Sequence, residues 1–154
     1  MSNDPLRVIL LVEDDPGDQE LFRAAIEDLG RPVTLVVASD GEEALEFLVR
    51  RGRFAAKGDH PMPDLVVLDL NMPRVEGRVF LRRIRAHDAL KCLPVVVMTT
   101  SGHENDVSSS YASGCNAFLT KPAGIDQLFE CVRMLHSFWF DFAKLPTPVC
   151  ETTL

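Results

Sequence analysis

LRVILLVEDDP, residues 6–16, decides the fold, because a run of seven mostly aliphatic positions leads directly into three consecutive carboxylates. The aliphatic side chains do not alternate with polar ones, which is typical of a strand covered on both faces in a parallel sheet. Asp15 and Pro16 have the residue types that favour a helix N-cap and the first helical position. The stretch therefore predicts a buried strand, an acidic strand end and a helix that begins immediately afterwards.

Four further runs of aliphatic and β-branched residues lie downstream in this 154-residue chain. Helical patterns separate them, and the apolar stripes over Leu21–Leu29 and Ile125–Leu135 are the clearest. Strand and helix alternate five times, which predicts an α/β fold, a doubly wound five-stranded parallel sheet with helices on both faces. The predicted strands are Leu6–Val12, Val33–Val37, Leu65–Leu68, Pro94–Met98 and Ala117–Leu119.

Local signals predict where the helices begin and end. Gly30 closes the first helix, and Ser39 with Glu42 forms a capping box for the second. Gly52–Pro63 has the composition of an exposed loop. His103–Ser113 is the poorest helix, because it is rich in Ser, Asn, Gly and Asp; it is either a marginal surface helix or an element that can shift. It offers only three residues to a core, namely Val107, Tyr111 and Ala112.

Composition excludes several classes of protein. An apolar fraction of 46% suffices for one domain with a core, and a net charge of −7 argues against nucleic-acid binding. The apolar runs fall far short of a membrane span and no secretion signal is evident, so we expect a cytoplasmic protein. A cluster of arginines is interpreted as a solvated helix face, and cysteines without metal spacing as reduced, mostly buried thiols. The arginines are Arg74, Arg78, Arg82, Arg83 and Arg85; the cysteines are Cys92, Cys115, Cys131 and Cys150.

Polar side chains gather where the predicted strands end. In a parallel α/β sheet these ends meet at the edge where ligands bind. Crowded carboxylates favour a hard cation with oxygen ligands, and a site with few protein ligands suits Mg²⁺. A nearby lysine can hold phosphoryl oxygens, and an aspartate can itself form an aspartyl-phosphate. The strand-end residues are Glu13, Asp14, Asp15, Asp69, Asn71, Thr99 and Lys121.

Each of these residues alone has an ordinary alternative. Asp15 is interpreted as an N-cap in preference to a metal ligand, and Asp69 could cap a turn. Lys121 could be a solvated surface residue, and Thr99 a simple strand-end hydroxyl. Their joint placement at successive strand ends is what favours a phosphoryl site.

Four blocks of sequence resemble the signature blocks of response-regulator receiver domains, in that family's order. The intervals of 30 residues from Asp69 to Thr99 and 22 from Thr99 to Lys121 are similar to the family's spacing. The resemblance covers roughly residues 6–139 and implies the flavodoxin-like (βα)5 receiver fold with a C-terminal extension. VEDDPGD (12–18), TTS (99–101) and the aromatic C-terminal segment most resemble the stand-alone regulators of phytochrome-type histidine kinases. The four blocks are VEDDP (12–16), LDLNMP (68–73), VMTT (97–100) and TKP (120–122).

The resemblance implies a role for each residue of the acidic edge. Asp69 would accept the phosphoryl group. Asp14 and Asp69 would bind Mg²⁺ through their carboxylates, Asn71 would lend its backbone carbonyl, and Glu13 would act largely through water. Lys121 would hold a phosphoryl oxygen.

A conformational switch is implied as well. Thr99 would hydrogen-bond the phosphoryl group and pull the following loop inward, and Phe118 would rotate inward as an aromatic switch residue. The bond from Lys121 to Pro122 would be cis. Because His103–Ser113 follows Thr99 directly, the resemblance favours the mobile interpretation of that helix.

The resemblance also implies the organisation of the chain: a receiver domain over residues 1–140, a tail over 141–154 and no output domain. We therefore expect a single-domain response regulator of a two-component phosphorelay, phosphorylated by a histidine kinase and not a turnover enzyme. Two alternatives remain. A haloacid-dehalogenase-like phosphatase needs a second Asp two residues after the nucleophile, where this chain has Asn71. A pseudo-receiver would bind partners without phosphorylation, although every expected site residue is present.

The aromatic C-terminal segment predicts a homodimer through the last helix and tail. Five large apolar residues of this segment have no obvious core position, and a monomer seldom exposes so many together. The resemblance implies a dimer through the same region. The alternative is a tail that folds back, with Leu145 and Pro146 beside the fifth strand. Residues expected to cover the sheet are Ile125, Leu128, Phe129, Val132 and Leu135; those left over are Met134, Phe138, Trp139, Phe140 and Phe142.

Overall fold

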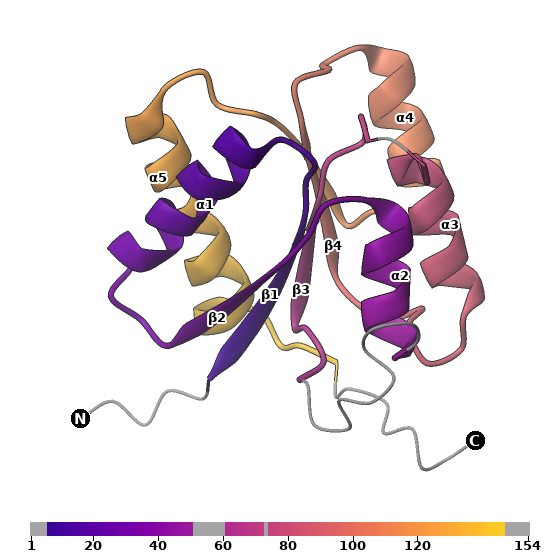
Figure 1. The fold of residues 1–154 in the computed structure, drawn as a ribbon, viewed down its shortest axis with the longest axis horizontal. Coiled ribbons are helices and arrows are strands. Elements are labelled where there is room, and N and C mark those ends of the chain that lie inside the picture. The colour runs from indigo at the N-terminus through magenta and orange to yellow at the C-terminus, as the bar shows by residue number, and fades with distance from the viewer. Residues whose placement is uncertain (1–5, 51–60, 73, 147–154) are drawn as a thin grey trace.

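The computed structural model describes residues 6–50, 61–72 and 74–146. Five parallel strands form one sheet in the order β2-β1-β3-β4-β5, which confirms the predicted doubly wound fold (Figure 1). The central strands β1, β3 and β4 are buried along almost their whole length, as their continuous aliphatic runs predict. The strands are β1 (Arg7–Val12), β2 (Val33–Ala38), β3 (Leu65–Leu68), β4 (Val95–Thr99) and β5 (Ala117–Thr120).

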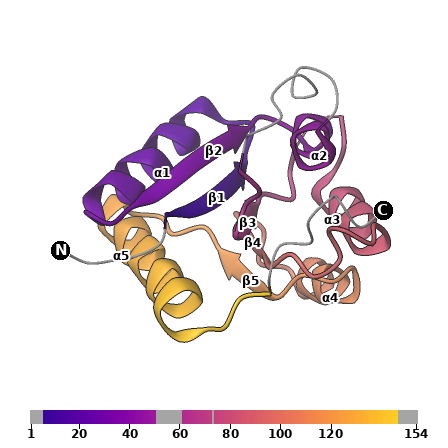
Figure 2. The ribbon, with the colours of Figure 1, turned by 90° about the horizontal axis from the view of Figure 1, so that it is seen from below.

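Helices cover both faces of the sheet (Figures 1 and 2). One face carries α1 and α5, and the other carries α2, α3 and α4. Gly30, at a φ of +62°, follows the end of α1 in the left-handed conformation that favours glycine. The helices are α1 (Pro16–Asp28), α2 (Gly41–Val49), α3 (Gly77–Ala86), α4 (Glu104–Ala112) and α5 (Ile125–His136).

Strand register brings the predicted site residues to one edge. Val12 pairs with both Ala38 and Leu68, so β1 and β3 end at the same level. The Asp69 N–H donates to the Val12 carbonyl at 3.0 Å, which continues the ladder to the first polar residue beyond β3. Residues that follow these strands therefore emerge side by side.

Two apolar clusters, one on each face, hold the layers together. Beneath α2 and α3 the core contains Phe47, Phe80 and Ile84, all nearly inaccessible to solvent. Between the sheet and the pair α1 and α5 it contains Phe22 and Ile26. Burial of this aliphatic and aromatic surface is the dominant favourable term in folding, and it fixes the strands whose ends form the polar edge.

The N-terminus of α1 follows the prediction, whereas that of α2 is shifted by one residue. Asp15 caps α1, and its carboxylate accepts a hydrogen bond from the first turn at 3.0 Å. At α2 the cap is Asp40, which accepts from the Glu43 N–H at 2.8 Å, while Glu43 accepts from the Ser39 N–H. The predicted box of Ser39 and Glu42 is wrong, because a charged carboxylate at the cap also interacts favourably with the helix dipole.

Helix α4 buries as little apolar surface as its sequence predicts. No side chain caps its N-terminus, and Ser110 is its one fully buried residue. Of the three residues expected to reach the core, Val107 is half-buried, whereas Tyr111 and Ala112 are exposed, because Ser110 takes the inward position. The Tyr111 hydroxyl instead accepts a hydrogen bond from the Phe118 N–H at 3.2 Å.

A π-helical turn, Ser137–Phe142, continues α5 and folds back onto the same domain. Trp139 and Phe140 pack against the cluster between α1 and α5, so the prediction that they lack a core position is wrong. The Arg7 guanidinium lies 5.5 Å from the centre of the Phe140 ring. An ion pair between Asp141 and Arg31, two residues before β2, helps to hold the turn in place.

The other apolar side chains of this segment lie at the surface. Met134, Phe138 and Phe142 are 61%, 58% and 80% exposed. Ile125, expected to cover the sheet, is also exposed because it is the first residue of α5 and lies at the helix tip. Leu145 is half-buried. The segment is therefore divided between residues that fold back and residues that remain available for a partner.

The arginine cluster is only partly a solvated face. Arg82 and Arg83 are exposed, as predicted. Arg85 instead donates to the backbone carbonyls of Leu93 and Gly114, each at 2.8 Å, and joins α3 to the loops that flank β4 and β5. A long arginine therefore satisfies loop carbonyls that have no partner within secondary structure.

The cysteines within the described part of the chain are free thiols. Cys115 is buried and Cys131 half-buried, in line with the expectation of mostly buried thiols, and Cys92 is exposed. Cys150 and most of the Gly52–Pro63 loop lie outside the described residues. Of the helices that the structure describes, none combines the length and the apolar character needed to span a membrane.

Candidate functional site

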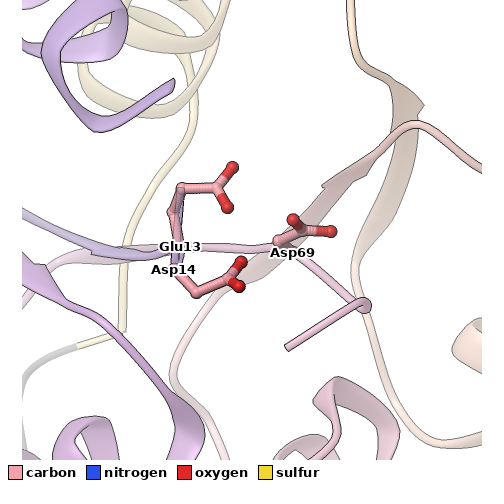
Figure 3. A group of neighbouring side chains, drawn as sticks. All are labelled: Glu13, Asp14 and Asp69. Atoms are coloured by element: carbon pink, nitrogen blue, oxygen red, sulfur yellow. The ribbon is translucent and has the colours of Figure 1, made fainter. Parts of the chain in front are cut away.

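Three carboxylates converge where β1 and β3 end (Figure 3). Oxygens of Glu13, Asp14 and Asp69 lie within 4.8 Å of one another. Glu13 and Asp69 are buried, while Asp14 faces solvent. A set of carboxylate oxygens that is open on one side fits a hard divalent cation that keeps several water ligands.

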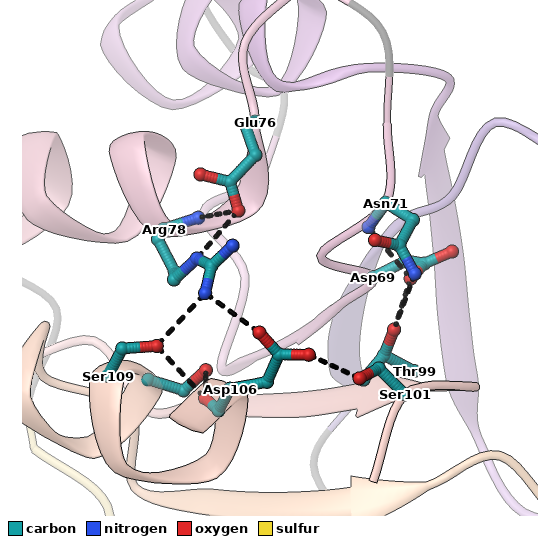
Figure 4. Close-up of polar contacts among 9 residues, drawn as sticks. Asp69, Asn71, Glu76, Arg78, Thr99, Ser101, Asp106 and Ser109 are labelled. Carbon is teal, nitrogen blue, oxygen red and sulfur yellow. Dashed lines mark hydrogen bonds and ion pairs between the residues drawn. The ribbon is translucent and has the colours of Figure 1, made fainter. Parts of the chain in front are cut away.

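Asp69 receives hydrogen bonds from three directions. The Thr99 hydroxyl donates to Asp69 Oδ1 at 2.9 Å, and the Asn71 N–H donates to the same oxygen at 3.2 Å. The Lys121 ammonium donates to Asp69 Oδ2 at 3.1 Å. The Asn71 side-chain amide lies 3.4 Å from the Thr99 hydroxyl (Figure 4). The structure thus brings Asp69, Thr99 and Lys121 together, as the sequence predicts.

Lys121 pairs with three carboxylates at once. It donates to Glu13, lies 2.9 Å from Asp18 Oδ2 and lies 3.1 Å from Asp69 Oδ2. Asp18, in the first turn of α1, is a site residue that sequence reasoning missed. The available signal was its position three residues after the Asp15 N-cap, in the first turn of the helix that follows the acidic end of β1.

Burial and charge shift the protonation of this edge. Burial raises the pKa of Glu13 to about 7, and the negative charge of Asp69 acts in the same direction, although the hydrogen bond from Lys121 opposes both. Burial alone would lower the pKa of Lys121, but its hydrogen bonds to Glu13 and Asp18 and the charge of Asp69 raise that pKa above its ordinary value. Lys121 is therefore a constant cation, whereas the charge on Glu13 is unfavourable without further positive charge.

Close backbone packing fixes the loop after Asp69. The Gly77 N–H at the start of α3 donates to the Leu70 carbonyl at 3.2 Å. A Cβ atom at Gly77 would lie 2.7 Å from Leu70 Cα, so only glycine permits this approach. On the opposite side, the Gln19 side chain donates to the Glu13 carbonyl at 2.6 Å. Both halves of the acidic edge are thus held by neighbouring helices.

A second polar network joins the loop after β4 to α3 and α4 (Figure 4). One guanidinium nitrogen of Arg78 donates to Asp106 and to Ser109, each at 3.0 Å. Asp106 also accepts a hydrogen bond from the hydroxyl of Ser101, two residues beyond Thr99. The hydrogen bond from Ser101, reinforced by Arg78, lowers the pKa of Asp106. This network connects the strand end that carries Thr99 to the first turn of α4.

The remaining expectations have mixed outcomes. The bond between Lys121 and Pro122 is trans, contrary to the cis form that the resemblance implies; trans is the intrinsically favoured isomer of such bonds by about 0.5–1 kcal/mol. Phe118 is half-buried and packs against the cluster beneath α2 and α3. Asn71 is exposed at the open side of the edge. Asp15 serves as the N-cap, the role preferred for it from sequence.

Known proteins resemble this chain in sequence and architecture. The family model for the response regulator receiver domain matches residues 9–133. The response regulator Rcp1 of Synechocystis sp. is 38% identical over 144 residues, which cover 94% of this chain and 96% of Rcp1. The crystal structure of the phosphorylated cyanobacterial phytochrome response regulator RcpA is 38% identical with a TM-score of 0.86, over 93% of this chain and 100% of that chain. The Mn²⁺-bound form of Rcp1 has a TM-score of 0.82 at 38% identity, over 92% of this chain and 99% of that chain.

The matched region contains the acidic edge together with Thr99 and Lys121. It also contains all five strands apart from the first two residues of β1. Fold, site geometry and family match therefore agree, and the chain belongs to the response-regulator receiver-domain family of two-component signalling.

Proposed function

We propose that Asp69 accepts a phosphoryl group from a sensor histidine kinase and that the protein signals by the resulting change in shape. The observation that carries the proposal is the environment of the Asp69 carboxylate. One oxygen accepts from Thr99, the other accepts from Lys121, and two further carboxylates lie beside it. A buried aspartate placed between a lysine and a cation site is suited to act as a nucleophile.

The carboxylates of Glu13, Asp14 and Asp69 would hold Mg²⁺, with the backbone carbonyl of Asn71 as a further ligand. Bound there, the ion supplies positive charge that offsets the carboxylates and the oxygens of the incoming phosphoryl group. Two observations support a divalent cation: the clustered oxygens themselves, and the Mn²⁺-bound form of the relative Rcp1.

Phosphoryl transfer would use groups that already surround Asp69. A carboxylate oxygen of ionised Asp69 forms a bond to phosphorus while the bond from phosphorus to the donor imidazole breaks. Lys121 and Thr99 now donate to the two carboxylate oxygens, so each is within a small shift of a phosphoryl oxygen. Their hydrogen bonds neutralise and orient the group as it arrives. Movement of Thr99 would then reach α4 through Ser101, and Phe118 would follow as the aromatic switch.

The kinase is of the phytochrome type in this proposal. RcpA, a phytochrome response regulator, aligns with 93% of this chain at 38% identity. Phosphotransfer from a panel of purified histidine kinases tests this point. Transfer from a phytochrome-type kinase should be the fastest, whereas equal or faster transfer from unrelated kinases would remove the pathway assignment.

Mass spectrometry after incubation with acetyl phosphate and Mg²⁺ tests the phosphoacceptor. We expect a single persistent adduct of one phosphoryl group, located on Asp69 after proteolysis. Rapid release of many equivalents of phosphate would instead indicate a phosphatase, and no adduct at all would indicate a pseudo-receiver. Asn71 already disfavours the phosphatase, since an amide cannot act as the general acid that such an enzyme requires.

We further propose a homodimer through α5 and the π-helical turn. Met134, Phe138 and Phe142 are exposed and spaced four residues apart, which places them along one side of this helical segment. The fold-back of Trp139 and Phe140 makes that side a rigid surface instead of a loose tail. An exposed apolar strip on an ordered element favours a partner of the same kind.

The oligomeric state of a surface variant tests the dimer. Phe138→Lys should yield a folded monomer by light scattering at micromolar concentration, whereas the unchanged protein should be a dimer. Asp88→Lys, at an exposed position after α3 and so away from α5, is a control for added charge and should remain dimeric. A monomeric wild-type protein at the same concentration would leave only the fold-back interpretation.

A further inference from the structure

All three N–H donors of the Lys121 ammonium group are occupied in this arrangement. An ammonium group carries three N–H donors, and three carboxylates, those of Glu13, Asp18 and Asp69, accept from it. A phosphoryl oxygen on Asp69 can be held by Lys121 only if one of these bonds is exchanged. The hydrogen-bonding capacity of Lys121 is therefore filled before any phosphoryl group arrives.

The three partners differ in how readily they can be released. Glu13 has a side chain that is 4% exposed, so loss of its cationic partner would leave a buried carboxylate unpaired. Asp69 is the phosphoacceptor, and its bond to Lys121 is transferred to the new group instead of being lost. The side chain of Asp18 is 43% exposed, so water can replace the lysine with a small loss of free energy. Asp18 is thus the partner whose bond to Lys121 weakens most easily when the lysine turns toward the phosphoryl group.

The space around Lys121 permits this exchange. A cavity of about 160 Å³ lies between α1 and the loop before α5, and Asp18 and Lys121 both line it. Much of its lining is apolar, with Phe22, Met98 and Leu128 among the lining residues. Lys121 can therefore move away from Asp18 and toward Asp69 without displacing packed side chains.

We infer that Asp18 is a positioning residue that holds Lys121 in the unphosphorylated protein and competes with the phosphoryl group for it. This inference rests on the proposed function of Asp69. Two physical effects act in the same direction: the ion pair with Asp18 draws Lys121 away from the phosphoryl group, and the Asp18 carboxylate repels an incoming anion. Asp18 therefore lowers the affinity of the site for phosphoryl groups, and it ties the first turn of α1 to the occupancy of the site.

Binding of beryllofluoride, a tetrahedral phosphoryl analogue, in saturating Mg²⁺ tests the inference by isothermal titration calorimetry. Asp18→Asn should bind about 2- to 5-fold more tightly than wild type, the range expected for one partly exposed ion pair. Asp18→Glu retains the carboxylate and should restore the wild-type value. Glu20→Gln removes an equal charge from the exposed side of the same helix and should change the affinity little, because Glu20 faces Arg23 and not the site.

Salt dependence separates this role from a purely structural one. The ratio of the beryllofluoride affinities of Asp18→Asn and wild type should approach one at 1 M salt, where the Debye length is about 3 Å. A difference in affinity that came from altered folding would persist at that salt concentration. Equal or weaker binding by Asp18→Asn at low salt would overturn the inference while leaving the proposed function intact. If the wild-type protein showed no Mg²⁺-dependent binding of beryllofluoride, the proposed function would be overturned, and the inference with it.

Discussion

Replacement of Glu13 by glutamine should make the metal-free protein more stable at neutral and alkaline pH. Glu13 is buried beside Asp69, and its pKa is raised from 4.5 to about 7. A group whose pKa is higher in the folded state favours folding when protonated and opposes it when ionised. The wild-type protein should therefore lose stability as the pH rises from about 4.5 through about 7. Glutamine does not titrate, and its amide oxygen can still accept a hydrogen bond from Lys121.

The size of the effect follows from the same pKa values. At about 1.4 kcal/mol for each pKa unit, full ionisation of Glu13 destabilises the folded state by about 3 kcal/mol. About 2 kcal/mol of this develops between pH 5.5 and 8.5, since the penalty begins near the ordinary pKa of the carboxyl. The difference in the free energy of unfolding between Glu13→Gln and wild type should widen by that amount over this range. Saturating Mg²⁺ should reduce or reverse the difference, because a bound cation stabilises the wild-type carboxylates.

Urea unfolding followed by circular dichroism, in EDTA at pH 5.5, 6.5, 7.5 and 8.5, measures the difference directly. Glu20→Gln serves as the control, because it removes a carboxylate that is exposed. Its stability should follow the wild-type pH profile. If the free energies of unfolding of Glu13→Gln and wild type changed with pH in parallel, the reasoning would be refuted. The raised pKa of Glu13 would then make no contribution to the stability of the folded protein.

Three further substitutions test the acceptor, the switch and the network that restrains α4. Asp69→Asn should fold normally yet gain no phosphoryl adduct from acetyl phosphate; an adduct at the wild-type rate would identify a different nucleophile. Thr99→Ala should still be phosphorylated, but amide exchange over residues 104–112 should no longer respond to beryllofluoride; a wild-type response would remove Thr99 from the switch. Arg78→Met should accelerate exchange of the same helix roughly 5-fold, as expected for loss of a charged hydrogen bond that is partly exposed. Arg82→Met, one turn away on the exposed face, should leave that exchange unchanged, and equal acceleration in both variants would exclude a specific role for Arg78.

The strands could be predicted from sequence to within a residue because their signal is local and strong. Val95–Thr99 and Leu65–Leu68 are continuous runs that are buried on both faces, so few other structures suit them. Once the strands are fixed, parallel pairing determines which polar residues meet. The positions of Asp69, Thr99 and Lys121 therefore followed from the order of the strands, without knowledge of any side-chain contact.

Contacts between distant helices and loops could not be predicted in the same way. Arg78 and Arg85 have the sequence appearance of surface residues, yet each reaches across a gap to groups on another element. Trp139 and Phe140 follow the last predicted helix without a pattern that reveals the π-helical turn which carries them back. In each case the partner lies far along the chain, so the pattern of neighbouring residues cannot predict the contact.

The charge at the acidic edge explains why a cation and a lysine belong to one site. Glu13, Asp14, Asp18 and Asp69 give four carboxylates against the single ammonium of Lys121, a net charge of −3 when all are ionised. Burial, together with the nearby charge of Asp69, raises the pKa of Glu13 in the metal-free protein. A divalent cation would reduce the imbalance to −1 and so permit a further anion to approach Asp69, which one lysine shared among three carboxylates cannot achieve alone. Because Asp18 competes with the phosphoryl group for the lysine, the cation and Asp18 act in opposite directions on the same site: the cation favours an incoming anion and the Asp18 carboxylate disfavours it.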